Sequence, residues 1–449
     1  MKNGIKRFLC VAVSVLMISS FFAGCKKSTP SSNSLSSDST KKVSLSVTWW
    51  GNDARNAKFN SILDIYQHLH PNVTLVRAYA SGDYFTRLAV QAAGNTLPDI
   101  FLMESMHKGT YVANKTMTDL KPYVDNGELD LKNFAKSAID SGRGSTDKVL
   151  YAVPLGTTIL ALTYNATLIK KAGMEPPKAR MTLAQYKDYL VALQAKLPAG
   201  YYAGEMDEQT PNVSAVFETQ MRQQGMELTS ADGKSIGYTK EALTTYYSYW
   251  MDLIKAGCVQ SPAVFASDSG KSYNEKAAGQ GKIGCWFGNA NAMKIFQQSI
   301  KDEMGMVPGF VVENAKYASC EAPQPSMWAI WSKSQNKDAA ARVISWFVND
   351  QAAQSIFDME LGVPGSTVID KMLIDTLKTD TVLVDRSKQI EINIINTMLP
   401  TLQPYPGRTT NAPALNADND KKFQEVMYGR MTIQQAVDAH FAAAPSILQ

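Results

Sequence analysis

The sequence predicts an α/β fold built from two lobes. The chain has 449 residues, which is more than one simple hydrophobic core accommodates and suits two lobes. Residues 44–103 alternate between strand and helix patterns, an order typical of a mostly parallel sheet covered by helices. Residues 167–300 carry mainly helical patterns interrupted by Pro and Gly, and we assign them to a second lobe.

The N-terminus has the pattern of a secretion signal. Three basic side chains within residues 2–7 precede residues 8–22, which carry no charge, and small residues follow at 23–24. The uncharged run is shorter than the roughly 20 residues that span a bilayer. We therefore assign residues 1–24 to a signal peptide. Without its three basic side chains the chain keeps 42 basic against 41 acidic residues, and this balance provides no electrostatic footprint for nucleic acid.

The residues around Cys25 predict a lipid anchor. Ala23-Gly24-Cys25 resembles the bacterial lipobox, in which the Cys is acylated and becomes the first residue of the mature protein, although Phe22 stands where Leu is usual. Residues 25–42 are mostly Ser, Thr, Lys, Asn and Pro, so they bury too little apolar surface to fold and predict a flexible tether. We expect a lipid-anchored protein on the extracytoplasmic face of the cell membrane. The alternative is an ordinary secreted protein or an uncleaved anchor.

Three cysteines, Cys258, Cys285 and Cys320, remain beyond the signal and Cys25, and none has C-x-x-C spacing. An odd number allows at most one disulfide within the chain, and the sequence leaves open whether one forms. The pattern predicts no metal cluster, and we expect no cofactor.

The expected elements follow from the spacing of apolar residues. Strands are predicted at residues 44–50, 73–79, 100–103 and 327–331, and helices at residues 59–69, 84–93 and 339–348. Two further apolar runs within residues 151–165 lie near the expected crossover between the lobes.

Six segments together suggest a family. They are VTWWGNDARN (47–56), HPNVTL (70–75), LPDIFLM (97–103), YAVPLGTTILALTYNATLIKKAGMEPP (151–177), GKIGCWFGN (281–289) and LGVPGS (361–366). None is a catalytic signature, and each is weak alone. In this order, and behind a lipobox, they resemble the family 1 extracellular solute-binding proteins, a maltose-binding-protein-like group that supplies ABC importers.

The resemblance implies a two-lobed periplasmic-binding-protein-like fold with a ligand cleft between lobes joined by crossover strands. It places residues 43–157 and 307–362 in the N-terminal lobe and residues 158–306 and 363–449 in the C-terminal lobe. It implies a sugar or oligosaccharide ligand, ABC permease subunits as partners, and attachment to the membrane through the lipid. We expect a monomer that does not bind nucleic acid. The alternatives are a binding protein for another solute, such as a glycerophosphodiester, and a surface enzyme that degrades polysaccharide.

The first candidate site residues follow the first strand. A sugar needs flat aromatic platforms for its faces and planar polar side chains for its hydroxyls. Alternation along a strand sends Trp49 and Trp50 to opposite faces, and we expect Trp50 in the cleft. Asn52, Asp53 and Arg55 match positions at which the family contacts sugar. For Asp53, a helix N-cap is the alternative role.

Further candidates come from later segments. Glu104 follows a predicted strand, where open α/β sheets bind ligands, although a solvated loop acid is the alternative. The family resemblance makes Trp286 an aromatic platform from the second lobe, next to Asn289, whereas a core Trp is the alternative. The remaining candidates are Trp328, Tyr202 (with Tyr201 and Glu205 nearby), Arg408 and, with less weight, His107. Enzyme motifs for phosphate, dinucleotide or serine chemistry are missing from the sequence, so we expect no catalytic residues.

Overall fold

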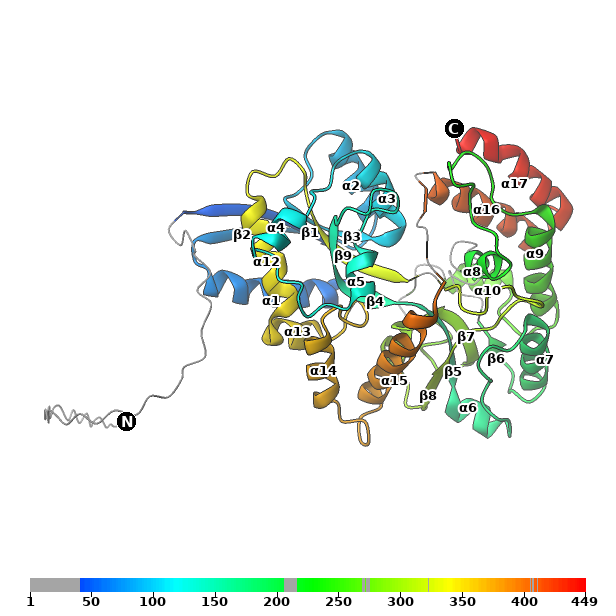
Figure 1. Cartoon of the computed structure of the whole chain (residues 1–449). Coiled ribbons are helices and arrows are strands. Elements are labelled where there is room, and N and C mark those ends of the chain that lie inside the picture. Colours follow the sequence, from blue (N-terminus) through cyan, green and yellow to red (C-terminus); the bar gives the residue numbers. More distant parts are fainter. Residues whose placement is uncertain are drawn as a thin grey trace, which may run out of the picture. The chain divides into compact units, whose positions relative to one another are not determined.

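The computed structural model describes residues 41–205, 216–268, 271, 275–321, 323–403, 405, 408–409 and 411–449. These residues form two separate β-sheets covered by helices, so the predicted α/β class is confirmed (Figure 1). The predicted signal peptide, Cys25 and nearly all of the tether lie outside the described residues. Within the described part, none of the helices is long and apolar enough to cross a membrane.

The first sheet has the strand order β2-β1-β3-β9-β4. Its strands are β1 (Val43–Trp50), β2 (Val73–Ala80), β3 (Ile100–Glu104), β4 (Ala152–Thr158) and β9 (Gln324–Ile330). Strand β1 pairs in parallel with β2 and β3, whereas β9 runs antiparallel between β3 and β4. Because β1 and β3 are parallel neighbours, their last residues, Trp50 and Glu104, stand at the same edge of the sheet.

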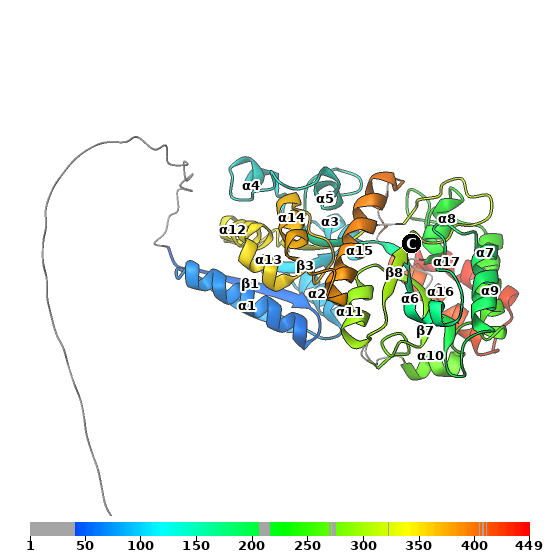
Figure 2. The same ribbon diagram turned by 90° about the horizontal axis from the view of Figure 1, so that it is seen from below.

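Helices cover this sheet because their apolar residues recur at helical spacing. These helices are α1 (Asp53–Leu69), α2 (Tyr84–Ala93), α3 (Ser105–Ala113), α4 (Lys121–Asp125), α5 (Lys136–Ser141), α12 (Lys337–Asn349) and α13 (Gln351–Phe357). Helices α1, α12 and α13 pack together, as Figures 1 and 2 both show. Phe59 of α1 is fully buried and contacts the rings of Trp49 and Trp328. This cluster forms the core of the first sheet.

The second sheet has the order β6-β7-β5-β8. Its strands are β5 (Leu160–Asn165), β6 (Tyr202–Gly204), β7 (Ile283–Asn289) and β8 (Met304–Val307). Strand β5 runs antiparallel to both β7 and β8, and β6 is parallel to β7. Consecutive side chains enter different cores: Leu160 and Leu162 join one buried cluster, whereas Ala161 joins the other.

The helices associated with the second sheet come from three stretches of the chain. They are α6 (Ala166–Lys171), α7 (Leu183–Gln194), α8 (Val216–Gln223), α9 (Lys240–Lys255), α10 (Pro262–Asp268), α11 (Ala292–Ser299), α14 (Thr367–Thr376), α15 (Leu383–Met398), the 3-10 turn Leu399–Thr401, α16 (Ala412–Met427) and α17 (Ile433–Ile447). Cys258, Cys285 and Cys320 are all buried and free.

Two chain segments meet where the first sheet gives way to the second. Strand β4 ends at Thr158 and β5 begins at Leu160. Beside this junction, Thr157 and Val363 exchange backbone hydrogen bonds of 2.8 and 3.0 Å. Gly362 lies at a φ of +103°, and a Cβ there would stand 2.5 Å from the Thr157 carbonyl oxygen. Only glycine satisfies both conditions without strain. The lobe boundaries given above remain predictions.

Candidate ligand-binding site

A narrow cavity of about 330 Å³ is lined by side chains from both sheets. Its volume falls at the lower end of the range typical of small-molecule sites in proteins, roughly 300–1,000 Å³. Six of the ten residues predicted to bind ligand line it: Trp50, Arg55, Glu104, Trp286, Asn289 and Arg408. The segments that carry these residues lie far apart in the sequence, and the fold brings them together.

The two adjacent tryptophans of β1 have different surroundings. Trp49 is 1% exposed and packs on Phe59 in the core, with ring centroids 5.0 Å apart. Trp50 is only partly buried and lines the narrow cavity. Its ring is supported by Tyr84 and Phe85 of α2, at centroid distances of 5.3 and 5.2 Å. Strand alternation therefore leaves Trp50 as the aromatic surface that the first sheet offers to the cavity.

Arg55 reaches the cavity because the turn before α1 is tight. Asn52 is the N-cap of α1, and its side-chain oxygen accepts a 2.9 Å hydrogen bond from the Arg55 backbone N–H. A Cβ at Gly51 would lie 2.5 Å from Arg55 Cδ, so glycine lets the arginine side chain fold back over the turn. The guanidinium donates from Nε to Glu360 Oε1 at 3.1 Å. Lys58 binds the other oxygen of Glu360 at 2.9 Å.

Glu104 is the last residue of β3 and lines the same cavity. Its carboxylate accepts no hydrogen bond from the residues that the structure describes. Burial raises its pKa to about 7, although the positive charges of Arg55 and Arg408 act to lower it. The site therefore contains an acid that titrates near neutral pH and has hydrogen-bonding capacity to spare.

The second sheet contributes Trp286 and Asn289 from β7. Trp286 is 2% exposed and packs edge-on against Phe296, with centroids 4.9 Å apart. It is therefore part of a core as well as of the cavity wall, and its role as an aromatic platform for a ligand remains a prediction. Its Nε1 and the Oδ1 of Asn289 are buried without a hydrogen-bond partner among the described residues. Buried polar atoms are almost always satisfied, so these two mark a place in the second-sheet wall where a hydrogen-bond partner is missing.

Arg408 enters the cavity from a late loop as part of a buried ion pair. It donates from Nε and Nη2 to Glu218 Oε2 at 3.1 and 2.5 Å, and both side chains are nearly inaccessible to solvent. Tyr405 donates its hydroxyl to the other oxygen of Glu218 at 2.8 Å. Burial acts to lower the pKa of Arg408, but the Glu218 carboxylate raises it above its usual range. The arginine is thus fixed in place and charged.

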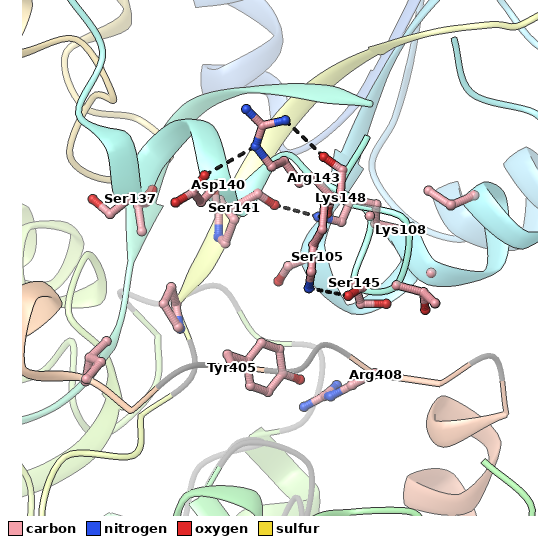
Figure 3. Close-up of a pocket in the computed structure, with 18 of the residues that line it drawn as sticks. Ser105, Lys108, Ser137, Asp140, Ser141, Arg143, Ser145, Lys148, Tyr405 and Arg408 are labelled. Carbon is pink, nitrogen blue, oxygen red and sulfur yellow. Dashed lines mark hydrogen bonds and ion pairs between the residues drawn. The ribbon is translucent and has the colours of Figure 1, made fainter. Parts of the chain in front are cut away.

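A wider cavity of about 2,050 Å³ shares Ser105, Pro323, Pro325, Tyr405 and Arg408 with the narrow one. In Figure 3, Tyr405 and Arg408 lie on one side of it and the labelled residues of the 105–148 region lie on the other. Six basic side chains line it: Lys108, Lys136, Arg143, Lys148, Lys234 and Arg408. Six acidic side chains balance them: Asp140, Asp147, Glu218, Glu227, Asp232 and Asp370. The charged lining is therefore neutral in sum.

Backbone carbonyls already bind the basic groups on one wall of this wider cavity. Lys108 donates to the carbonyls of Ser141 and Arg143, both at 2.5 Å, and burial lowers its pKa to about 8. Arg143 donates to the carbonyl of Lys148 at 2.9 Å and to Asp140 at 3.2 Å (Figure 3). These contacts stabilise the loop before β4. They also leave fewer N–H donors of Lys108 and Arg143 free to bind an anionic ligand.

Four predicted site residues do not line either cavity. Asn52 serves as the helix cap, so the alternative N-cap role for Asp53 is wrong, and Asp53 instead accepts a 2.6 Å hydrogen bond from Tyr79. Trp328 is 2% exposed and packs between Phe59 and Phe347, because β9 lies inside the sheet and is covered on that face.

Tyr202 stands on β6, the edge strand of the second sheet, opposite Ile283. It packs against the core that contains Trp286, outside both cavities. His107 stacks on Phe85 with centroids 3.9 Å apart, and burial lowers its pKa to about 4. His107 is therefore uncharged at neutral pH and supports the ring beneath Trp50.

Sequence reasoning missed several lining residues. Thr158, Gln324, Ser326 and Tyr405 add polar groups to the narrow cavity, and Glu218 and Glu360 hold its two arginines. Tyr405 lies three residues before Arg408, so the prediction of Arg408 as a site residue could have been extended to Tyr405. The two glutamates contact their arginines across 190 and 305 residues of sequence, and no local pattern indicates such pairs.

The sequence is similar to known binding proteins. Over 146 residues it is 24% identical to the melibiose/raffinose/stachyose-binding protein MelE of Bacillus subtilis (strain 168), a stretch that covers 32% of each chain. The chain thus matches about a third of the length of this curated relative.

Solved structures share the fold. An extracellular solute-binding protein family 1 structure from Alicyclobacillus acidocaldarius subsp. acidocaldarius DSM 446 matches with a TM-score of 0.68 and 23% identity, covering 92% of this chain and 100% of that one. The periplasmic oligogalacturonide binding protein from Yersinia enterocolitica, in complex with saturated digalacturonic acid, matches with a TM-score of 0.74 and 19% identity, covering 91% and 99%. The fold is that of the two-lobed periplasmic binding proteins, as predicted.

The family itself is bacterial extracellular solute-binding protein, and its pattern matches residues 51–354, which is well over half of the chain. The match includes the turn before α1, the end of β3 and β7, and it contains four of the six cavity residues predicted from the sequence. The chain belongs to the bacterial extracellular solute-binding protein family.

Proposed function

We propose that this protein is the substrate-binding lipoprotein of an ABC importer and that it captures a sugar or oligosaccharide in the cavity between its two sheets. One observation carries the proposal. Trp50 and Trp286, from different sheets, line one cavity together with the unpaired Asn289 oxygen and the Glu104 carboxylate. Aromatic faces suit the apolar C–H patches of a sugar, and unpaired polar atoms suit its hydroxyls.

The size of the space favours a ligand of several units. The narrow cavity holds about 330 Å³, and the wider one, which shares five lining residues with it, holds about 2,050 Å³. An oligosaccharide with one end in the narrow cavity would extend into the wider one. The relative MelE is a melibiose, raffinose and stachyose binder, which makes such neutral oligosaccharides the first ligands to test.

Two other functions are less well supported. A glycerophosphodiester would need free cations, but Arg55 and Arg408 are each paired with a glutamate. A glycosidase would need two carboxyl groups flanking the bond to be cleaved. Glu104 is the only carboxylate among the described residues that line the narrow cavity. The family consists of binding proteins, so we propose that the ligand is bound without turnover.

The test is a binding screen of the purified protein. Melibiose, raffinose, stachyose and a set of monosaccharides are compared by thermal shift and then by calorimetry. A ligand at 100 times its dissociation constant should stabilise the fold by about 2.7 kcal/mol. The bound sugar is recovered afterwards and analysed by mass. Failure of every sugar to bind would refute the proposed ligand class, and cleaved sugar in proportion to protein would indicate an enzyme.

The proposed membrane anchor has a separate test. Cys25→Ala removes the predicted acylation site, so we expect the protein to leave the membrane fraction or to keep its signal peptide. The matched control is Cys10→Ala, which changes a cysteine inside the predicted signal and should leave fractionation unaltered. Retention of the Cys25 variant in membranes at its normal size would contradict the lipoprotein assignment. Delivery to permease subunits belongs to the same proposal and rests on the family.

A further inference from the structure

The charged side chains that line the narrow cavity differ in whether they have a hydrogen-bond partner. Among the described residues that line it, Arg55, Glu104 and Arg408 carry formal charge. Arg55 is paired with Glu360 at 3.1 Å, and Arg408 is paired with Glu218 at 2.5 Å. Each arginine therefore already binds a carboxylate, although Glu360 also binds Lys58. Glu104 accepts no hydrogen bond from any described residue, so its carboxylate is the charge that the protein leaves for the ligand to meet.

The other titratable groups near Glu104 do not change this balance. His107 of α3 is uncharged at neutral pH because burial lowers its pKa to about 4. Tyr84 of α2 stays protonated because burial raises its pKa well above the usual value. Lys108 is one turn along α3 and binds two loop carbonyls at the wider cavity. From β9, the residue paired with Glu104 is Ser326, which carries no charge.

We propose that Glu104 is the specificity-determining residue of the narrow cavity, which it makes selective for an uncharged sugar unit and closed to a uronate. The proposal rests on the proposed function and narrows its ligand class. Hydroxyls of a neutral unit can donate to the Glu104 carboxylate and to the unpaired Asn289 oxygen. A uronate carboxylate brings a second negative charge beside Glu104 into a cavity of about 330 Å³, where both arginines already bind glutamates.

The size of the discrimination follows from the charge of Glu104 and from an assumed separation between its carboxylate and that of a bound uronate. Two like charges about 5 Å apart near a protein surface repel strongly enough to weaken binding on the order of 100-fold. Loss of a hydrogen bond to a charged acceptor weakens binding roughly 10- to 100-fold. The digalacturonate carried by the structural relative from Yersinia enterocolitica is therefore a suitable anionic probe. Raffinose, named for the relative MelE, is a suitable neutral probe.

The experiment measures both probes by calorimetry at pH 8.0 and pH 5.5 with the full-length protein. The Glu104 carboxyl has a pKa of about 7, so it is mainly charged at the first pH and mainly protonated at the second. An ordinary carboxylate such as a uronate stays ionised at both values. We expect raffinose affinity to fall on acidification and digalacturonate affinity to rise. Opposite trends distinguish this mechanism from a general loss of folding.

The variant Glu104→Gln keeps the shape of the side chain and removes its charge. We expect raffinose to bind roughly 10-fold more weakly, digalacturonate to bind on the order of 100-fold more tightly, and both pH trends to disappear. Glu128→Gln is the matched control, because Glu128 pairs with Arg342 outside both cavities. The control should keep the affinities and the pH trends of the unmodified protein.

The remaining outcomes distinguish a failure of the selectivity proposal from a failure of the proposed function. If digalacturonate binds the unmodified protein at pH 8.0 as tightly as raffinose, the selectivity proposal is overturned while the sugar-binding function stands. Unchanged affinities in Glu104→Gln would overturn it as well. If melibiose, raffinose, stachyose and digalacturonate all fail to bind, the proposed function itself fails, and the selectivity proposal falls with it.

Discussion

The carboxyl group of Glu391 should make the stability of this protein depend on pH. Glu391 lies in α15 and is fully buried, and neither of its oxygens accepts a hydrogen bond from the described residues. Burial raises its pKa to about 7, although Lys294 and Lys388 act to lower it. A buried carboxyl that accepts no hydrogen bond prefers its neutral form, and here burial outweighs the two nearby lysines.

The sign and size of the effect follow from this pKa. The folded protein binds the proton more tightly than the unfolded chain, whose Glu titrates near 4.5. The stabilisation is therefore complete below about pH 4.5 and is lost as the pH rises through about 7. A shift of this size corresponds to about 3 kcal/mol in the free energy of unfolding. Glu391→Gln removes the titration. It also removes the charge that most raises the pKa of buried Lys294, although Lys294 keeps its carbonyl acceptors at Asp358 and Met359.

The assay is urea unfolding followed by Trp fluorescence at pH 5 and pH 8. We expect Glu391→Gln to have nearly the stability of the unmodified protein at pH 5 and to exceed it by about 2–3 kcal/mol at pH 8. Glu104 titrates in the same range but is present in both proteins, so it cancels in the difference. Glu128→Gln is the control. Its free energy of unfolding should differ from that of the unmodified protein by the same amount at both pH values. The same stability difference at both pH values would refute the reasoning.

Three further predictions concern packing and the backbone. Trp50→Ala should weaken sugar binding roughly 30-fold with little change in the free energy of unfolding, because Trp50 lines the cavity, whereas Trp49→Ala should lose about 3–5 kcal/mol, because it is core. Trp286→Ala should lose both stability and affinity, because this side chain is 2% exposed and also lines the cavity; a normal melting temperature would contradict this. Gly362→Ala should destabilise the fold by more than Gly127→Ala, since both have positive φ but a Cβ at Gly127 meets nothing within 4 Å. Urea unfolding measures that excess, and equal losses would contradict the predicted clash.

The fold was more predictable than the site because its signals are local. Alternation and helical spacing depend on neighbouring residues, so the strands at 73–79 and 100–103 and the helix at 84–93 are confirmed as β2, β3 and α2 within a residue or two. Alternation also separated Trp49 from Trp50 correctly as core and cavity residues. Each of these inferences needed only the residues on either side.

The placement of Trp328 and Tyr202 depends on the strand order of the sheets, and neither residue lines the cavities. A Trp next to a strand signal could line a cavity or fill a core, and Trp328 fills a core because β9 lies between β3 and β4. Tyr202 lies on an edge strand, a position that depends on where β7 pairs. Strand order is a long-range property, and the sequence contains no local pattern for it.

The buried charges suggest why the site could not be recognised from residue type alone. Arg55 and Arg408 look like anion-binding residues in sequence, but each is held by a glutamate far away in the chain. These ion pairs hold the two arginines in place, one in α1 and one in the late loop, and they reduce the positive charge that each arginine presents to a ligand. Removing Glu360 or Glu218 would leave an uncompensated arginine beside Glu104, and the cavity would then attract an anion. The chemistry that the cavity offers is decided by residues that do not line it, as with Glu360, or that line only its wider neighbour, as with Glu218.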